Sequence, residues 1–293
     1  MASEQGIALV EEQKWLDPIS DVLQKAINGA FSSGGAAGQR IANALHGTWL
    51  GHPLHPVLTD VPIGAWTVAL VLDIAEGSTG NKKYARGADA AITVGLIGAV
   101  GAAITGLTDW HKIDGKPRRL GITHGLLNTI AAGLYTSSLI ARRRKSRSTG
   151  RVLSGIGYAI AATSAYLGGN LVYQERIGVD HTGDLELPDK FVGAIAETEL
   201  KDGELKKADV AGVPVLLLRK GGKIEAIVER CSHLGGPLSE GELIENSVRC
   251  PWHGSRFCLE TGRVLDGPSA FNQPCFDVRT SGGQVEIKAR EKR

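Results

Sequence analysis

The chain has 293 residues, enough for two domains of ordinary size that each bury a core of their own. Its formal net charge of +2, with no basic stretch interleaved with aromatic residues, argues against a nucleic-acid partner. All four cysteines lie after position 230, which does not fit the disulfide framework of a small secreted protein.

The N-terminal region, residues 1–50, carries a helical pattern. Apolar residues recur at spacings of three and four between residues 16 and 30, and Asp17-Pro18 opens the pattern, which predicts an amphipathic helix. Its polar face is not strongly basic, so two alternatives stay open. The helix lies on a membrane surface, or it packs on its own protein.

Four apolar runs follow in a block rich in Gly and Ala, each near the length that a helix needs to cross hydrocarbon. The first contains Asp60 and Asp73, which a helix places roughly 20 Å apart, near opposite interfaces. We expect a four-span membrane domain over residues 51–175, and a soluble bundle of Ala-rich helices is the alternative. The four runs are Val57–Ala75, Ala90–Leu107, Leu120–Ala141 and Val152–Val172.

The composition changes again after residue 175. Residues 176–190 form a mixed stretch typical of a linker. From residue 191 to 293, short β-like segments alternate with Gly-containing turns, which predicts an all-β domain. The expected fold class is therefore multidomain, an all-α four-helix transmembrane bundle followed by an all-β domain.

The β region contains a cysteine and histidine pattern with metal-ligand spacing. Cys231 and His233 are separated by one residue, Cys250 and His253 by two, and sixteen residues lie between the two pairs. This pattern resembles the Rieske family, in which two thiolates hold one iron of a [2Fe-2S] cluster and two imidazoles hold the other. A structural zinc site is the alternative, because two Cys and two His also satisfy tetrahedral zinc.

The resemblance implies which residues serve the cluster. Cys231 and Cys250 would hold the first iron, and His233 and His253 the second. The Gly-rich loops would point backbone amides at sulfur, and the segment Gly267-Pro268-Ser269 matches the proline-containing loop that covers the cluster in this family.

The resemblance also indicates the kind of Rieske centre. Members from quinol-oxidising complexes carry a disulfide whose positions correspond here to Gly236 and Trp252, and a tyrosine hydroxyl where this sequence has Phe257. Ser255 keeps its hydroxyl. With fewer hydrogen bonds to the reduced cluster, we expect a lower potential, in the range of Rieske ferredoxins. Cys258 and Cys275 are interpreted as small buried hydrophobic side chains, with a redox role as the alternative.

No catalytic residue is assigned. Ring-hydroxylating oxygenases begin with a Rieske domain and continue for hundreds of residues to a second iron site, whereas this sequence ends forty residues after His253. We therefore expect no oxygenase catalytic domain in this sequence. Whether the chain is an enzyme in its own right stays open, with an oxidoreductase component as the expectation.

Histidines gather towards one predicted side of the membrane domain. The segment Gly51-His52-Pro53-Leu54-His55-Pro56 resembles an uncharacterised family of bacterial four-helix membrane domains, which implies a fold but no activity. His52, His55 and His124 form a candidate second site that would ligate haem or another metal, or handle the protons of a quinone. The alternative is that these side chains cap helices or sit in the interface.

The expected location is a bacterial inner membrane, crossed several times. The basic loop 142–151 would place the cluster domain outside by the positive-inside rule. The missing disulfide cysteines favour a reducing compartment instead, and the side of the membrane stays open.

The function expected from these features is a membrane-anchored carrier of single electrons between redox partners. One alternative is an integral membrane oxidoreductase, in which the helical bundle itself serves a quinone or a haem. Another is a redox sensor that signals through the cluster. The expected partners are membrane lipid and a redox protein or quinone.

Overall fold

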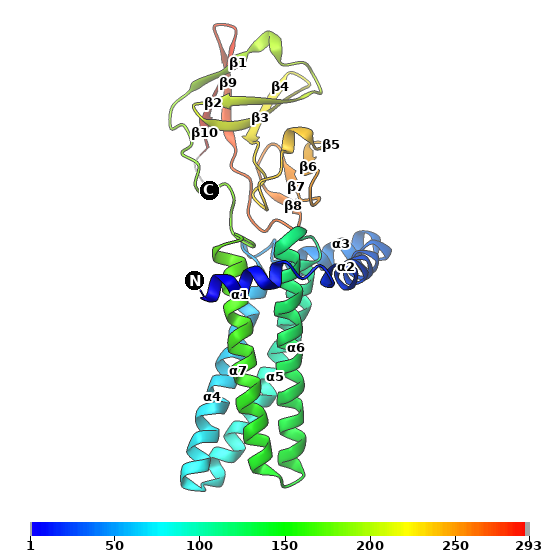
Figure 1. Cartoon of the computed structure of the whole chain (residues 1–293). Coiled ribbons are helices and arrows are strands. Elements are labelled where there is room, and N and C mark those ends of the chain that lie inside the picture. The colour runs from blue at the N-terminus through cyan, green and yellow to red at the C-terminus, as the bar shows by residue number, and fades with distance from the viewer. Residues whose placement is uncertain (1, 291–293) are drawn as a thin grey trace. The chain divides into compact units, whose positions relative to one another are not determined.

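The computed structural model describes residues 2–290 (Figure 1). These residues divide into two compact units that do not follow the chain in simple order. Among the described residues, the first unit contains 2–38 and 53–177 and is helical. The second contains 39–52 and 178–290 and is mostly β. The predicted fold class, helical plus all-β, is confirmed.

Within residues 2–290, seven helices precede the first strand. Three of them belong to the N-terminal region, and four long helices follow. Within the first unit, α4 packs along α5 and α6 packs along α7, so the bundle consists of two helical hairpins. The helices are α1 (Ala2–Glu11), α2 (Leu16–Ser33), α3 (Gly35–His46), α4 (Leu54–Thr79), α5 (Lys82–Trp110), α6 (Gly115–Arg143) and α7 (Arg147–Tyr173).

Local signals define the tight turn between α4 and α5. Gly80 adopts a φ of +70° at the end of α4, a conformation that glycine reaches without steric cost. The Asn81 side chain then accepts a hydrogen bond from the Lys83 N–H at 2.9 Å and caps the start of α5. The two helices therefore reverse direction within two residues.

Two of the described helices, α4 and α5, are long and apolar enough to cross a membrane by length and composition. Helices α6 and α7 correspond to the third and fourth predicted spans but do not meet the same criterion. They carry more Ser, Thr, Asn and Arg than the first hairpin does. Length and apolarity thus support two of the four predicted spans.

Helix α2 packs on its own unit through one face. Leu16, Leu23 and Ile27 lie in a cluster with Trp110 and other apolar residues of the bundle, whereas Ile19 and Val22 stay exposed. The structure therefore supports the second alternative for this helix, packing on its own protein.

An ion pair fixes α2 to α6. The Asp17 carboxylate accepts hydrogen bonds from both Arg118 and Arg119, with the closest contact at 2.6 Å. The hydrogen bonds from Arg119 above all lower the pKa of Asp17 to about 2. The carboxylate is therefore charged throughout the physiological pH range.

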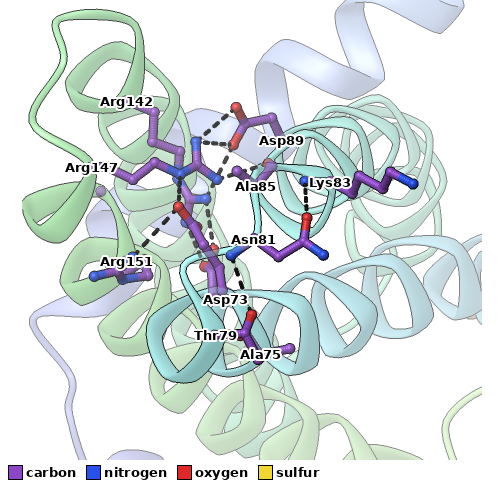
Figure 2. A network of polar contacts seen from close by, with 12 residues as sticks. Asp73, Ala75, Thr79, Asn81, Lys83, Ala85, Asp89, Arg142, Arg147 and Arg151 are labelled. Atoms are coloured by element: carbon purple, nitrogen blue, oxygen red, sulfur yellow. Dashed lines mark hydrogen bonds and ion pairs between the residues drawn. The ribbon is translucent and has the colours of Figure 1, made fainter.

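A buried ionic network joins all four long helices (Figure 2). Asp73 of α4 is 4% exposed and receives both terminal nitrogens of Arg142 from α6, at 2.7 and 2.5 Å. Arg142 also contacts Asp89 of α5, and the Ser154 hydroxyl of α7 donates to Asp73. Arg147 of α7 also pairs with Asp89 and extends the network to Glu76 of α4. Buried charges are tolerated only when they are paired and hydrogen-bonded in this way.

The β domain contains three antiparallel sheets with strand orders β1-β10-β9, β2-β3-β4 and β5-β6-β7-β8. Buried Val and Leu side chains from the first two sheets form its main core, and Phe257 lies in a second apolar cluster with the two cysteines of the motif. The strands are β1 (Val192–Ala196), β2 (Leu205–Val210), β3 (Val213–Lys220), β4 (Lys223–Val228), β5 (Glu242–Ile244), β6 (Ser247–Arg249), β7 (Arg256–Cys258), β8 (Val264–Asp266), β9 (Phe276–Ser281) and β10 (Gln284–Ala289).

Candidate metal centre

Two loops of the β domain carry the cysteine and histidine pairs, and they share one backbone geometry. In each loop the cysteine N–H donates to the carbonyl five residues later, and the cysteine carbonyl accepts from the N–H four residues later. These bonds measure 2.9 and 2.9 Å at Cys231, and 2.8 and 3.1 Å at Cys250. Gly235 and Gly254 occupy the same place in the two loops, with φ of +77° and +83°.

The two cysteines lie inside this pair of loops. Cys231 is 1% exposed and Cys250 is 3% exposed, and the two thiol groups hydrogen-bond to each other. In both loops the backbone N–H groups two and three residues after the cysteine donate to its sulfur. Such amides stabilise negative charge on sulfur, as the sequence predicted.

The contact between the two thiol groups shifts their pKa values in opposite directions. Hydrogen bonding to Cys250, followed by burial, raises the pKa of Cys231. The hydrogen bond from Cys231 lowers the pKa of Cys250 to about 7. Thiolate is the form of cysteine that binds metals, so the lowered pKa of Cys250 favours metal binding by its sulfur.

The two histidines of the motif form a second pair. The ring centroids of His233 and His253 lie 5.0 Å apart with the planes at 81°. The Nδ1 atom of His233 is buried without a hydrogen-bond partner. Burial, and then the nearby imidazoles of His253, His46 and His181, hold the pKa of His233 well below its usual range. A neutral imidazole with a buried, unpartnered nitrogen is suited to metal ligation.

The arrangement disfavours the zinc alternative. Within residues 2–290, no group of three or more His, Cys, Asp and Glu side chains is placed to hold a single metal ion. A structural zinc ion needs four such ligands around one point. A cysteine pair and a separate histidine pair instead suit two metal atoms with two protein ligands each.

Comparison with known proteins agrees with this geometry. Residues 190–277 match the family model described as the Rieske [2Fe-2S] domain. The chain is also 35% identical over 94 residues to the 3-phenylpropionate/cinnamic acid dioxygenase ferredoxin subunit of Escherichia coli (strain K12), covering 88% of that protein and 32% of this chain. The chain belongs to the Rieske family. The cofactor of its β domain is a [2Fe-2S] cluster.

Two further relatives each match about a third of this chain. Apoptosis-inducing factor 3 of Mus musculus is 34% identical over 91 residues, and the match spans about 15% of that protein and 31% of this chain. The solved ferredoxin of carbazole 1,9a-dioxygenase from Nocardioides aromaticivorans IC177 is 28% identical, with a TM-score of 0.33, over 34% of this chain and 99% of the ferredoxin. Homology to ferredoxin subunits implies that the Rieske domain transfers electrons.

The helical part has a match of its own. Residues 51–181 match the family described as a predicted membrane protein (DUF2231). The expected pairing of a four-helix membrane-type domain with a ferredoxin-like Rieske domain is therefore confirmed at the level of families.

A third loop ties the two cluster loops of the Rieske domain together. The Gln273 side chain accepts from the Ser232 N–H at 3.0 Å and donates to the carbonyls of Val228 and Arg230. Ser269, in the predicted proline-containing loop, donates its N–H to the Ser255 hydroxyl at 2.9 Å. The sequence pattern did not single out Gln273, because a lone glutamine carries no motif.

The positions that would carry a disulfide in quinol-oxidising relatives are neighbours here. A Cβ atom added to Gly236 would lie 3.1 Å from the Trp252 ring and 2.8 Å from the Cys250 sulfur. The predicted correspondence of Gly236 and Trp252 agrees with this geometry. Trp252 is 57% exposed, and its ring lies beside His253. It stands at one of the two positions that the disulfide occupies in those relatives.

A segment from before the bundle also belongs to the unit with the Rieske domain. The Asn43 side chain donates to the Leu265 carbonyl and the Asp266 carboxylate, and it accepts from the Gly267 N–H, at 3.0 to 3.1 Å. His46 lies against Gly267, where an added Cβ atom would approach its ring to 2.8 Å. Asn43 thereby clamps the chain just before Pro268, a contact that no sequence motif indicated.

Replacing Ser255 with alanine is expected to lower the reduction potential of the cluster. The Ser255 oxygen accepts from Ser269, so its own proton is left to donate towards the cluster sulfur. Loss of a hydrogen bond worth about 1 kcal/mol corresponds to about 40 mV for one electron. Potentiometric titration measures this shift. Ser281→Ala, at the exposed end of β9, is the matched control, and an equal shift in both variants would contradict the role of Ser255.

Replacing Asn43 with alanine is expected to loosen the loop that contains Pro268. Three hydrogen bonds are lost, at a cost of roughly 1–3 kcal/mol in unfolding free energy. The cluster should bleach faster than in the wild type when a chelator is added. Arg40→Ala, on the exposed side of α3, is the control and should bleach at the wild-type rate. Equal rates in N43A and wild type would contradict the clamp.

The three histidines of the second predicted site are divided between the two units. His52 belongs to the unit with the Rieske domain, whereas His55 and His124 belong to the bundle. The rings of His55 and His124 are neighbours in an edge-on arrangement, with centroids 6.4 Å apart and planes at 90°. Two of the three candidates thus form a pair within one unit.

Proposed function

We propose that this protein is a membrane-anchored carrier of single electrons. The observation that carries the proposal is the division of the motif into a buried cysteine pair and a histidine pair. In this assignment Cys231 and Cys250 hold one iron, and His233 and His253 hold the other. When bound, the [2Fe-2S] cluster supplies a one-electron couple.

The residues around the cluster would set its potential and its contact with partners. Backbone amides aimed at both cysteine sulfurs stabilise the more negative, reduced state. Buried Phe257 has no hydroxyl that could donate a hydrogen bond to the cluster. We therefore propose a reduction potential towards the lower end of the Rieske range, at about −150 mV. Pro251 and Trp252 are exposed beside His253 and provide a surface for electron exchange.

Helices α4–α7 would anchor the protein as a multi-pass domain of a bacterial inner membrane. The match to a predicted membrane protein family and the two long apolar helices support this anchor. Partners would be a redox protein or a quinone at the same membrane. Relatives of the Rieske domain are ferredoxin subunits of dioxygenases, which favours a reductase or an oxygenase as the class of protein partner.

Low-temperature paramagnetic resonance of the detergent-purified chain tests the cluster assignment. After reduction with dithionite, the signal should be that of a histidine-ligated [2Fe-2S] centre and distinct from an all-cysteine cluster. Alkaline carbonate washing of membranes tests the anchor, because an integral protein stays in the pellet. A zinc-loaded, colourless protein would reject the [2Fe-2S] cluster, and release into the supernatant would reject the membrane anchor.

A further inference from the structure

The buried positions of α4 recur in α6 at a constant interval. Every buried residue of α4 from 62 to 73 has a buried counterpart 69 positions later in α6. The pairs are Pro62 with Ala131, Trp66 with Tyr135, Ala69 with Ser138, and Asp73 with Arg142. Few of the equivalent residues are identical, so the repeat lies in the burial pattern more than in the residues.

The other two long helices repeat in the same way. All six buried residues of α7 lie 62 positions after a buried residue of α5. The pairs are Ala88 with Gly150, Ile92 with Ser154, Gly95 with Gly157, Ala102 with Ser164, Thr105 with Leu167, and Thr108 with Asn170. The bundle therefore consists of two equivalent hairpins, α4–α5 and α6–α7, as in proteins built from parallel internal repeats.

Equivalent residues of α4 and α6 meet across the middle of the bundle. Trp66 stacks on Tyr135 with ring centroids 4.2 Å apart. Asp73 pairs with Arg142, as Figure 2 shows. His55 and His124 are also 69 positions apart, and their ring centroids lie 6.4 Å apart with the planes at 90°. Contacts between a residue and its own equivalent place all three pairs on an approximate two-fold axis.

Each histidine is held by its own hairpin in the same manner. The Nδ1 atom of His55 lies 2.9 Å from the carbonyl oxygen of Ala102, and that of His124 lies 2.8 Å from the carbonyl oxygen of Ser164. Ala102 and Ser164 are themselves equivalent in the repeat. A proton on Nδ1 makes these contacts hydrogen bonds and leaves the lone pair on Nε2. Metal-ligating histidines commonly donate their other ring N–H to a backbone carbonyl in this way, which fixes the orientation of the ring.

Glycines at equivalent positions make room for the two rings. A Cβ atom added to Gly106 would lie 2.8 Å from His55 Cε1, and one added to Gly168 would lie 3.1 Å from His124 Cε1. Any larger residue would displace the ring that it faces. Each hairpin thus provides one glycine that leaves room for the imidazole ring and one backbone carbonyl that accepts from its Nδ1.

We propose that His55 and His124 are the two protein ligands of one transition-metal centre on the axis of the bundle. Two imidazoles that bind a metal from opposite sides, with metal–nitrogen bonds of about 2.0 Å, place their ring centroids roughly 6 Å apart. The observed 6.4 Å agrees with this arrangement.

The ligand set selects the kind of metal centre. No group of three or more His, Cys, Asp and Glu side chains in residues 2–290 is placed to hold a metal ion, so a zinc ion would lack ligands here. Haem iron brings its own equatorial nitrogens and needs only two axial imidazoles. A copper(I) ion also accepts two imidazoles. Both are one-electron centres, and the test below distinguishes them.

One contact competes with the metal. The Asn128 amide nitrogen lies 3.1 Å from His124 Nε2 and satisfies that lone pair in the metal-free site. Metal binding would displace this amide. Removal of the amide should therefore leave metal affinity unchanged or increase it.

Titration of the full-length protein in detergent tests the site. Hemin is added in one arm and copper(I), with a chromophoric competitor, in the other. One equivalent should bind in one arm. His55→Ala and His124→Ala should each weaken binding more than about a hundredfold. Loss of a metal ligand costs more affinity than loss of a residue that only hydrogen-bonds to a ligand. With hemin, perpendicular rings predict a strongly anisotropic low-spin ferric resonance.

Asn128→Ala and His52→Ala are the matched controls and should retain binding. The cluster signal in the same samples reports separately on the Rieske domain, so this inference can fail while the proposed electron carrier stands. Binding that is no tighter in the wild type than in the H55A/H124A double variant overturns the site. Stoichiometric zinc, or loss of binding in H52A, overturns it as well, since either shows a larger ligand set.

Discussion

Replacing Cys250 with serine is expected to abolish the optical and paramagnetic signals of the [2Fe-2S] cluster. Cys250 is buried, receives backbone amides on its sulfur, and has a pKa of about 7. A serine hydroxyl is far less acidic than a thiol and is a poor ligand for iron in such clusters. The measurement is iron and sulfide content together with the low-temperature resonance of the detergent-purified protein.

Cys258 provides the matched control. It lies in strand β7 of the same domain, half-buried and outside the predicted ligand set. Cys258→Ser should keep a full complement of iron and an unchanged resonance. Retention of the cluster in C250S, or its loss in C258S alone, would show that the ligands are assigned wrongly.

Replacing Asp73 with asparagine is expected to destabilise the bundle by about 3–5 kcal/mol. Arg142 would keep Asp89 and Ser154 as partners but would lose the carboxylate that receives both of its terminal nitrogens. A buried charge that loses its main partner is costly, because the solvation it gave up on folding is no longer offset. In detergent, the midpoint of thermal unfolding should fall by about 10 °C.

Asp60→Asn controls for the loss of one carboxylate from the same helix, because Asp60 is exposed. This variant should unfold near the wild-type temperature. The double variant Asp73→Leu with Arg142→Leu removes both charges and should recover most of the stability that either single variant loses. A midpoint in D73N equal to that of D60N would mean that the network in Figure 2 does not stabilise the bundle.

The sequence was sufficient to predict the fold class and the family because both depend on local patterns. Gly and Ala in long apolar runs predicted the helices, and the spacing of Cys231, His233, Cys250 and His253 predicted the cluster domain. The second hairpin was harder to interpret, because α6 and α7 carry polar residues that face partners inside the bundle. Arg142 is the plainest case, since it looked like part of a basic loop and is in fact buried against Asp73.

Other features required the structure because they join distant parts of the chain. Asn43 contacts Asp266 across 223 residues, and no local pattern can indicate such a contact. The internal repeat of the bundle was not evident because equivalent residues such as Trp66 and Tyr135 differ in type. Only their burial and their mutual contact reveal the equivalence.

The clamp formed by Asn43 also has a consequence for biogenesis. The Rieske unit is completed by chain segments that are made before and after the four long helices, so those helices are an insertion within it. A ribosome must therefore finish the whole insertion before the first segment can meet its partners. If all four long helices cross the membrane, as proposed, the chain returns to the side where it started, which allows the two segments to join. Cluster delivery should accordingly be a late event in the maturation of this protein.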